Sequence, residues 1–171
     1  MVPLRTNRFA GILTLVVFTC LTAGSFAAEK GEVSPLSRAL SSVTLFKGLT
    51  DGERDSLKAA ATLRHGKAGE RIIEQGKHMS RMFILLEGRA EVRIDGEPIV
   101  TLSGQTLVGE IEFLDGFPAS ADVHLLEETD LIELNNEALT SLMERQPRLG
   151  YVIMHELAVI EARRLRNMNA K

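Results

Sequence analysis

The pattern of apolar and polar residues divides the chain into three stretches. From Phe9 to Ala28 no charged residue occurs. Between Thr62 and Asn135, short apolar runs alternate with glycines at positions 66, 69, 76, 88, 96, 104, 109 and 116. After Asn135 the apolar residues recur at helical spacing. We therefore expect an apolar leader, a β-rich domain and a helical C-terminal part.

The central stretch predicts about eight short strands. The clearest runs are RIIE, RMFILLE, RAEVRI, PIVTL, SADVHL and TDLIEL. In RAEVRI the apolar residues at 90, 92 and 94 alternate with charged ones, which is typical of a half-buried strand. Asp95-Gly96 follows directly, and this dipeptide is a strong hairpin signal. Strands and turns at this interval indicate a sandwich, jelly roll or barrel.

Helices are predicted on both sides of the strands. The segment Thr50-Asp51-Gly52-Glu53 has the spacing of a capping box, and the helix it opens should reach about Ala61. Asn135 should cap a second helix that ends before Pro147, and a longer helix should run over 148–169. The first half of that helix is apolar nearly all round. We expect burial on two sides, against the β-domain and against a protein partner or a second copy, although one deep groove is the alternative.

The leader has the form of a secretory signal peptide. Arg5 and Arg8 precede the apolar run, and Ser25-Phe26-Ala27 suits cleavage before Ala28. The alternative is an uncleaved membrane anchor, because about 20 apolar residues span a bilayer. We therefore expect 1–27 to be a signal peptide or anchor, 28–43 a tether running into a short helix, and 44–171 the domain. The protein should be periplasmic or secreted, and membrane-bound only if the leader stays.

Composition restricts the possible chemistry. The 171 residues suit one domain, and the net charge of −3 argues against a nucleic-acid partner. Cleavage would remove Arg5 and Arg8, leaving 18 basic and 23 acidic residues and a net charge of −5. It would also remove Cys20, the only cysteine, so a disulfide or thiolate metal site is not expected. The arginines at 163, 164 and 166 are interpreted as complements to the helix dipole.

An enzyme is not expected. The four histidines, His65, His78, His124 and His155, are scattered and form no metal-binding pair. The sequence contains no nucleophile-base motif and no glycine-rich phosphate loop. We expect no catalytic residues and no metal.

Two segments carry a family resemblance. AGERIIEQGKHMSRMFILLEGRAEVRIDGE and VGEIEFLDGFPASADV resemble the cyclic nucleotide-binding domain of catabolite activator proteins and kinase A regulatory subunits. The resemblance covers roughly 44–168. It implies a mainly β fold with flanking α-helices: an eight-stranded jelly roll with short N-terminal helices and two C-terminal helices. It also implies a regulatory module for which cAMP or cGMP is a possible ligand.

The resemblance extends to the family's phosphate-binding cassette. It implies a binding site formed by Gly109, Glu110, Ile111, Glu112, Ala119, Ser120 and Ala121. In the family the glycine permits a tight turn, the glutamate accepts from a ribose hydroxyl, and an arginine pairs with the phosphate. Here Ala119 stands where that arginine belongs, and Glu112 stands where a small residue is usual.

The loss of the arginine predicts weak binding or none. A charge-assisted hydrogen bond is worth about 1.5–3 kcal/mol. A carboxylate ~4 Å from the phosphate costs about 4 kcal/mol more at a surface dielectric. Glu112 is expected to turn into solvent, and the hollow should contain no cation. The alternative is a working sensor of cyclic nucleotide or of a neutral small molecule, with Arg64, Arg81, Arg89 or Arg93 replacing the lost arginine.

Overall fold

The computed structural model describes residues 33–169 of the chain, so the predicted leader and the start of the tether lie outside the described residues. The elements follow the chain in this order: α1 (Pro35–Ser42), η1 (Thr44–Phe46), α2 (Asp51–Ser56), η2 (Leu57–Ala59), β1 (Ala61–Gly66), β2 (Arg71–Ile73), β3 (Arg81–Leu85), β4 (Arg89–Ile94), β5 (Glu97–Ser103), β6 (Thr106–Val108), α3 (Glu110–Asp115), β7 (Asp122–Leu125), β8 (Thr129–Asn135), α4 (Asn136–Arg145) and α5 (Pro147–Asn169).

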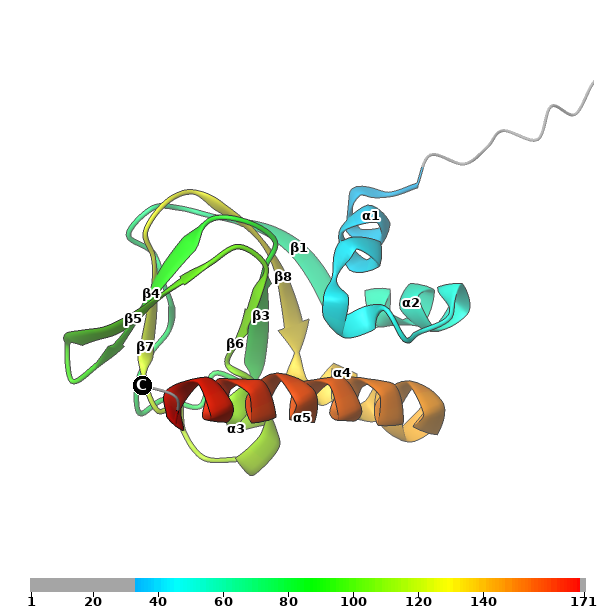
Figure 1. Ribbon diagram of the computed structural model, residues 1–171. Helices are drawn as coiled ribbons and strands as arrows, with labels where there is room; N and C mark the ends of the chain where they lie inside the picture. Colours follow the sequence, from blue (N-terminus) through cyan, green and yellow to red (C-terminus); the bar gives the residue numbers. More distant parts are fainter. Residues whose placement is uncertain (1–32, 170–171) are drawn as a thin grey trace, which may run out of the picture. The chain divides into compact units, whose positions relative to one another are not determined.

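The eight strands form two antiparallel four-stranded sheets (Figure 1). One sheet has the order β1-β8-β3-β6 and the other the order β2-β7-β4-β5. This confirms the predicted jelly roll with flanking helices. The sequence pattern had not marked β1 or β6, and their pairing with β8 and β3 makes them strands.

The predicted hairpin joins β4 to β5. Asp95 and Gly96 have φ values of 53° and 85°, which suits a two-residue turn with two left-handed residues. The expected alternation holds at Ala90, which is fully buried, but Ile94 is 41% exposed. The pairing of β4 with β7 ends at Arg93, so Ile94 lies beyond the part of β4 that has β7 as its neighbour.

The helix termini follow the predicted caps. The Glu53 amide donates to Thr50 Oγ1 at 3.3 Å, and the Thr50 amide donates to Glu53 Oε2 at 2.8 Å. Helix α2 nevertheless ends at Ser56 and continues as a 3₁₀ turn rather than reaching Ala61. Asn135 caps α4 by accepting from the Ala138 amide at 2.8 Å.

The ordered domain begins earlier than residue 44. Helix α1 occupies 35–42 within the expected tether, and its Leu40 is 1% exposed. The sequence predicts a tether running into a short helix, and α1 is a helix in that stretch. Leu40 is apolar and lies on the face of α1 that packs into the main core.

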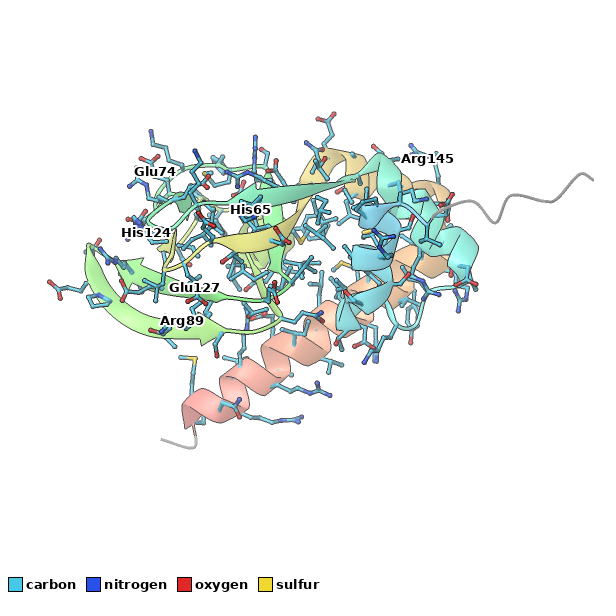
Figure 2. The ribbon with its side chains drawn as sticks, turned by 90° about the horizontal axis from the view of Figure 1, so that it is seen from above. His65, Glu74, Arg89, His124, Glu127 and Arg145 are labelled. Carbon is cyan, nitrogen blue, oxygen red and sulfur yellow. The ribbon has the colours of Figure 1, made fainter. Side chains whose placement is uncertain are left out.

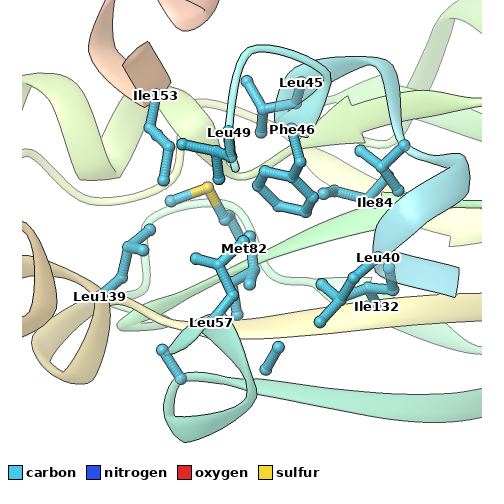
Figure 3. Close-up of a cluster of buried hydrophobic side chains, with 14 of the residues drawn as sticks. Leu40, Leu45, Phe46, Leu49, Leu57, Met82, Ile84, Ile132, Leu139 and Ile153 are labelled. Atoms are coloured by element: carbon cyan, nitrogen blue, oxygen red, sulfur yellow. The ribbon is translucent and has the colours of Figure 1, made fainter. Parts of the chain in front are cut away.

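The main core lies between the helices and the β1-β8-β3-β6 sheet (Figure 3). It joins residues from both ends of the described chain, including Phe46 and Ile153, which are both fully buried. Leu149, Ile153 and Leu157 form the buried face of α5. On other faces of α5, Tyr151 is 71% and Met154 38% exposed, so the described residues cover this helix on one side.

A second, smaller core lies between the two sheets and includes Ile73, Val108, Ala119 and Val123. These four residues also border the cavity described below. Among residues 33–169, no helix combines the length and the apolar character that a membrane crossing requires.

Candidate functional site

A cavity of about 210 Å³ lies where β6 passes into α3. Its wall is lined by Ile73, Val92, Val100, Leu102, Val108, Gly109, Glu110, Ile111, Glu112, Ala119, Ser120, Ala121, Val123 and Arg164. The wall thus contains all seven residues that the cassette resemblance names, Gly109 to Glu112 and Ala119 to Ala121. It also contains one residue from α5 that the sequence did not suggest.

The cavity begins at a turn that requires glycine. Gly109 precedes α3 with φ +85°, in the left-handed region that residues with a side chain rarely adopt. A Cβ atom there would lie 3.0 Å from the Arg81 carbonyl oxygen and 3.0 Å from Ile73 Cδ1. The turn and the close packing of β3 against it together fix glycine at this position.

Glu112 does not turn into solvent as the sequence predicted. Its side chain is buried, and its two oxygens accept from the Met79 and Ser80 amides at 2.9 Å each. Ser80 has φ 54°, so the carboxylate holds a backbone turn in an uncommon conformation. Two N–H donors offset its charge, and the residue serves the fold of the cassette.

The two aspartates of the cassette are likewise bound to backbone. Asp122 Oδ1 accepts from the Gln75 amide at 2.8 Å and lies 3.6 Å from Arg71 Nη1. Asp115 Oδ1 accepts from the Phe117 amide at 2.9 Å. Three of the carboxylates in this stretch of sequence, those of Glu112, Asp115 and Asp122, therefore bind backbone amides and stabilise loops.

Glu110 is paired with a guanidinium from the C-terminal helix. Its side chain is 4% exposed, and its Oε1 accepts from Arg164 Nη1. Arg164 also donates to Glu161 Oε1 at 3.0 Å and, through Nη2, to the Leu107 carbonyl. Figure 1 shows the C-terminal half of α5 passing beside α3, where this contact forms.

Two opposing effects act on the pKa of Glu110. Burial raises the pKa of Glu110, and the attraction of Arg164 acts in the opposite direction. Oε2 of Glu110 is buried and has no hydrogen-bond partner in residues 33–169. The carboxylate therefore has one satisfied oxygen and one unsatisfied oxygen.

Two expectations about the cavity are wrong. The hollow does contain a cation, and Arg164 does not merely complement the helix dipole. The signal was present in the helix periodicity, because 164 continues the series 149, 153, 157 and 160 on the inward face of α5. Sequence alone did not show that this face continues from the core to the cavity.

The four arginines considered as replacements lie elsewhere. None of them is among the residues of the cavity wall. Arg81 and Glu133 are 2.8 Å apart, and Arg89 and Glu127, labelled in Figure 2, are 3.1 Å apart. Arg64 pairs with Glu70, and Arg93 with Glu91.

The histidines make separate contacts. His65 Nδ1 is 2.8 Å from Asp130 Oδ1, and this hydrogen bond raises the pKa of His65. His155 stacks on Tyr151 with 5.9 Å between ring centroids. In the part of the chain that the structure describes, no three His, Cys, Asp or Glu side chains are grouped to hold a metal.

The sequence has relatives among regulatory proteins and enzymes. Residues 63–146 match the family model described as "Cyclic nucleotide-binding domain". A cAMP-dependent protein kinase regulatory subunit of Mycosarcoma maydis is 34% identical over 113 residues, covering 61% of this chain and 22% of that protein. Glutaminase 2 of Bradyrhizobium diazoefficiens is 30% identical over 174 residues, covering 99% of this chain and 27% of that protein. The chain thus spans about a quarter of these relatives' length.

Solved structures share the fold. A catabolite activator protein of Thermus thermophilus matches with a TM-score of 0.60 and 30% identity, covering 74% of this chain and 60% of that one. A cyclic nucleotide-binding domain from Methylobacillus flagellatus matches with a TM-score of 0.66 and 20% identity, covering 77% of each chain. The second likeness speaks for the fold alone.

Proposed function

Because the chain belongs to the cyclic nucleotide-binding domain family, we propose that it is a non-enzymatic regulatory module in which cAMP and cGMP bind weakly or not at all. The observation that carries the proposal is the occupied guanidinium in the cavity wall. Arg164 is already paired with Glu110 and Glu161, so two carboxylates stand against one cation.

A cyclic phosphate would have to displace Glu110 from Arg164. That exchange would leave a carboxylate that is only 4% exposed beside a second negative charge. Two unit charges about 4 Å apart repel by about 4 kcal/mol at a protein-surface dielectric. This repulsion is larger than the about 1.5–3 kcal/mol that one charge-assisted hydrogen bond contributes. Each 1.4 kcal/mol of difference is about a tenfold change in affinity.

The size of the cavity supports the same proposal. Its volume of about 210 Å³ lies below the range of about 300–1,000 Å³ that is usual for sites of drug-sized ligands. A nucleotide would therefore need more room than the wall, which includes Arg164, leaves in this structure.

Calorimetric titration with cAMP and with cGMP tests the proposal. We expect no binding tighter than the millimolar range for the natural sequence. Ala119→Arg restores the cation of the family cassette and should improve affinity at least tenfold, whereas Ala119→Met, matched in length, should not. Micromolar binding by the natural sequence would refute the proposal.

A working anion sensor is the second candidate, and Arg164 is the observation that favours it. Its side chain is 33% exposed and forms part of the cavity wall. In this reading Arg164 replaces the missing arginine once Glu110 releases it. The natural sequence would then bind cAMP in the micromolar range and Arg164→Met would abolish that binding, while the first candidate predicts weak binding by both proteins.

We also propose a protein partner for α5, in the form of a second copy of the chain. Five apolar residues recur along this helix at spacings of three, four or seven residues and are all exposed: Tyr151, Met154, Ala158, Leu165 and Met168. Such a stripe is typical of helix pairing. Sedimentation should show a dimer that Tyr151→Ser with Leu165→Ser dissociates. The control Asn167→Ser, on an exposed residue outside the stripe, should stay dimeric.

Export is proposed on the sequence of the leader alone. Cleavage between Ala27 and Ala28 would deliver the domain to the periplasm or the medium, and an uncleaved leader would anchor it to the membrane. Cell fractionation followed by N-terminal sequencing of the protein distinguishes the two. A cytoplasmic protein that begins at Met1 would refute both.

A further inference from the structure

The cavity wall is apolar except at one end. Side chains of Ile73, Val92, Val108 and Val123 form its interior, and Ala119 replaces the cation that the family places there. The second carboxylate of the wall, Glu112, already accepts two backbone hydrogen bonds. Besides the Ser120 hydroxyl, the side-chain polar groups available to a ligand are therefore those of Glu110 and Arg164.

These two side chains have complementary unmet hydrogen-bonding capacity. Glu110 Oε2 is buried and lacks a donor, which is unfavourable for a polar atom removed from water. Arg164 uses Nη1 and Nη2, but the described residues offer no hydrogen-bond acceptor to its Nε. One end of an apolar cavity thus presents an acceptor without a donor beside a donor without an acceptor.

The charge balance selects among ligands that could fill both roles. Glu110 and Glu161 outnumber Arg164 by one negative charge, so an anion is disfavoured. A zwitterion adds no net charge and provides both an ammonium donor and a carboxylate acceptor. A guanidinium binds a carboxylate in a forked geometry, and an ammonium group can donate three hydrogen bonds.

The volume restricts the apolar part of the ligand. The volume of about 210 Å³ is below the about 300–1,000 Å³ that is usual for sites of drug-sized ligands. Such a space suits a branched aliphatic side chain and is small for a nucleoside. Burying that side chain against the valines and isoleucine would favour binding.

We propose that the ligand of this cavity is a free aliphatic α-amino acid of the size of valine or leucine. Its ammonium group pairs with Glu110, its carboxylate pairs with Arg164, and its side chain fills the space above Val108 and Val123. The inference rests on the proposed function, because it takes the cavity to be the ligand site of a regulatory module. It adds the chemical class of that ligand.

The test is a titration with four matched probes. L-leucine carries both charged groups, 3-methylbutylamine lacks the carboxylate, 4-methylpentanoate lacks the ammonium group, and glycine lacks the side chain. We expect leucine to bind and to raise the melting temperature, and each of the other three to bind at least tenfold more weakly. An amine that binds as well as leucine would overturn the role of Arg164, and an acid that does so would overturn that of Glu110.

Variants separate binding from folding. Ala119→Leu fills the cavity from the wall without touching the ion pair and should abolish leucine binding in a folded protein. Glu110→Gln should weaken leucine binding at least tenfold, while the exposed Glu137→Gln in α4 should leave it unchanged. Absence of leucine binding would overturn this inference but not the proposed function, which micromolar cAMP binding would refute.

Discussion

Breaking the pair between Arg164 and Glu110 should destabilise the protein measurably. Arg164→Met keeps much of the apolar stem but removes the guanidinium, and so leaves the Glu110 carboxylate, 4% exposed, without its cation. Breaking a fully buried ion pair costs about 3–5 kcal/mol. Because the Arg164 side chain is 33% exposed, we expect a smaller loss of about 2–3 kcal/mol. At about 2–4 °C per kcal/mol for a chain of this size, the melting temperature should fall by about 4–12 °C.

A double-mutant cycle isolates the pair itself. Glu110→Gln removes the charge that Arg164 compensates, so the double variant should be about 1–2 kcal/mol more stable than the sum of the two single losses predicts. Urea unfolding followed by far-ultraviolet circular dichroism suits a chain without tryptophan. Losses that add within about 0.5 kcal/mol would mean that the two side chains do not interact, and the account of the cavity would be wrong.

Three further substitutions test the surroundings of the site and the helix caps. Gly109→Ala should lower the free energy of unfolding by about 1–3 kcal/mol, because alanine is strained in the left-handed region, and an unchanged urea midpoint would contradict this. Glu112→Ala should cost about 2–4 kcal/mol in the same assay, because it leaves the Met79 and Ser80 amides without their acceptor, and Glu112→Gln should cost less. The Arg148 hydrogen bond and the Thr50 amide lower the pKa of Glu53 from 4.5 to about 2, so its stabilising contribution is present above pH 4.5 and is lost as the pH falls toward 2. Glu53→Gln should therefore flatten the decline of melting temperature between those pH values, and an identical decline would refute the assignment.

Local signals in the sequence were enough for most of the fold. Asp95-Gly96 fixes its hairpin, and Thr50 and Asn135 cap their helices, because each of these features depends on a few neighbouring residues. Strands β1 and β6 escaped detection for the opposite reason. β1 carries polar residues, β6 has three residues, and both owe their extended form to partners distant in sequence.

The candidate site was also predictable only in part. The order of the cassette motifs places Gly109, Glu110 and Ala119 around one cavity, since the motif and the fold go together. The charge of that cavity was not predictable, because it depends on contacts across the fold. Glu112 meets amides 32 and 33 residues away, and Glu110 meets a guanidinium 54 residues away. The residues adjacent in sequence to Glu110 and Glu112 give no indication of these contacts.

The main core has a consequence for how the domain can be divided. Phe46 and Ile153 belong to one buried cluster although they come from opposite ends of the described chain. The family match, residues 63–146, includes neither. A fragment limited to residues 63–146 would therefore expose to solvent the apolar residues of the main core that Phe46 and Ile153 cover, and it should precipitate. In the intact molecule, the packing of the N-terminal helices therefore depends on that of the C-terminal helix, and the reverse also holds.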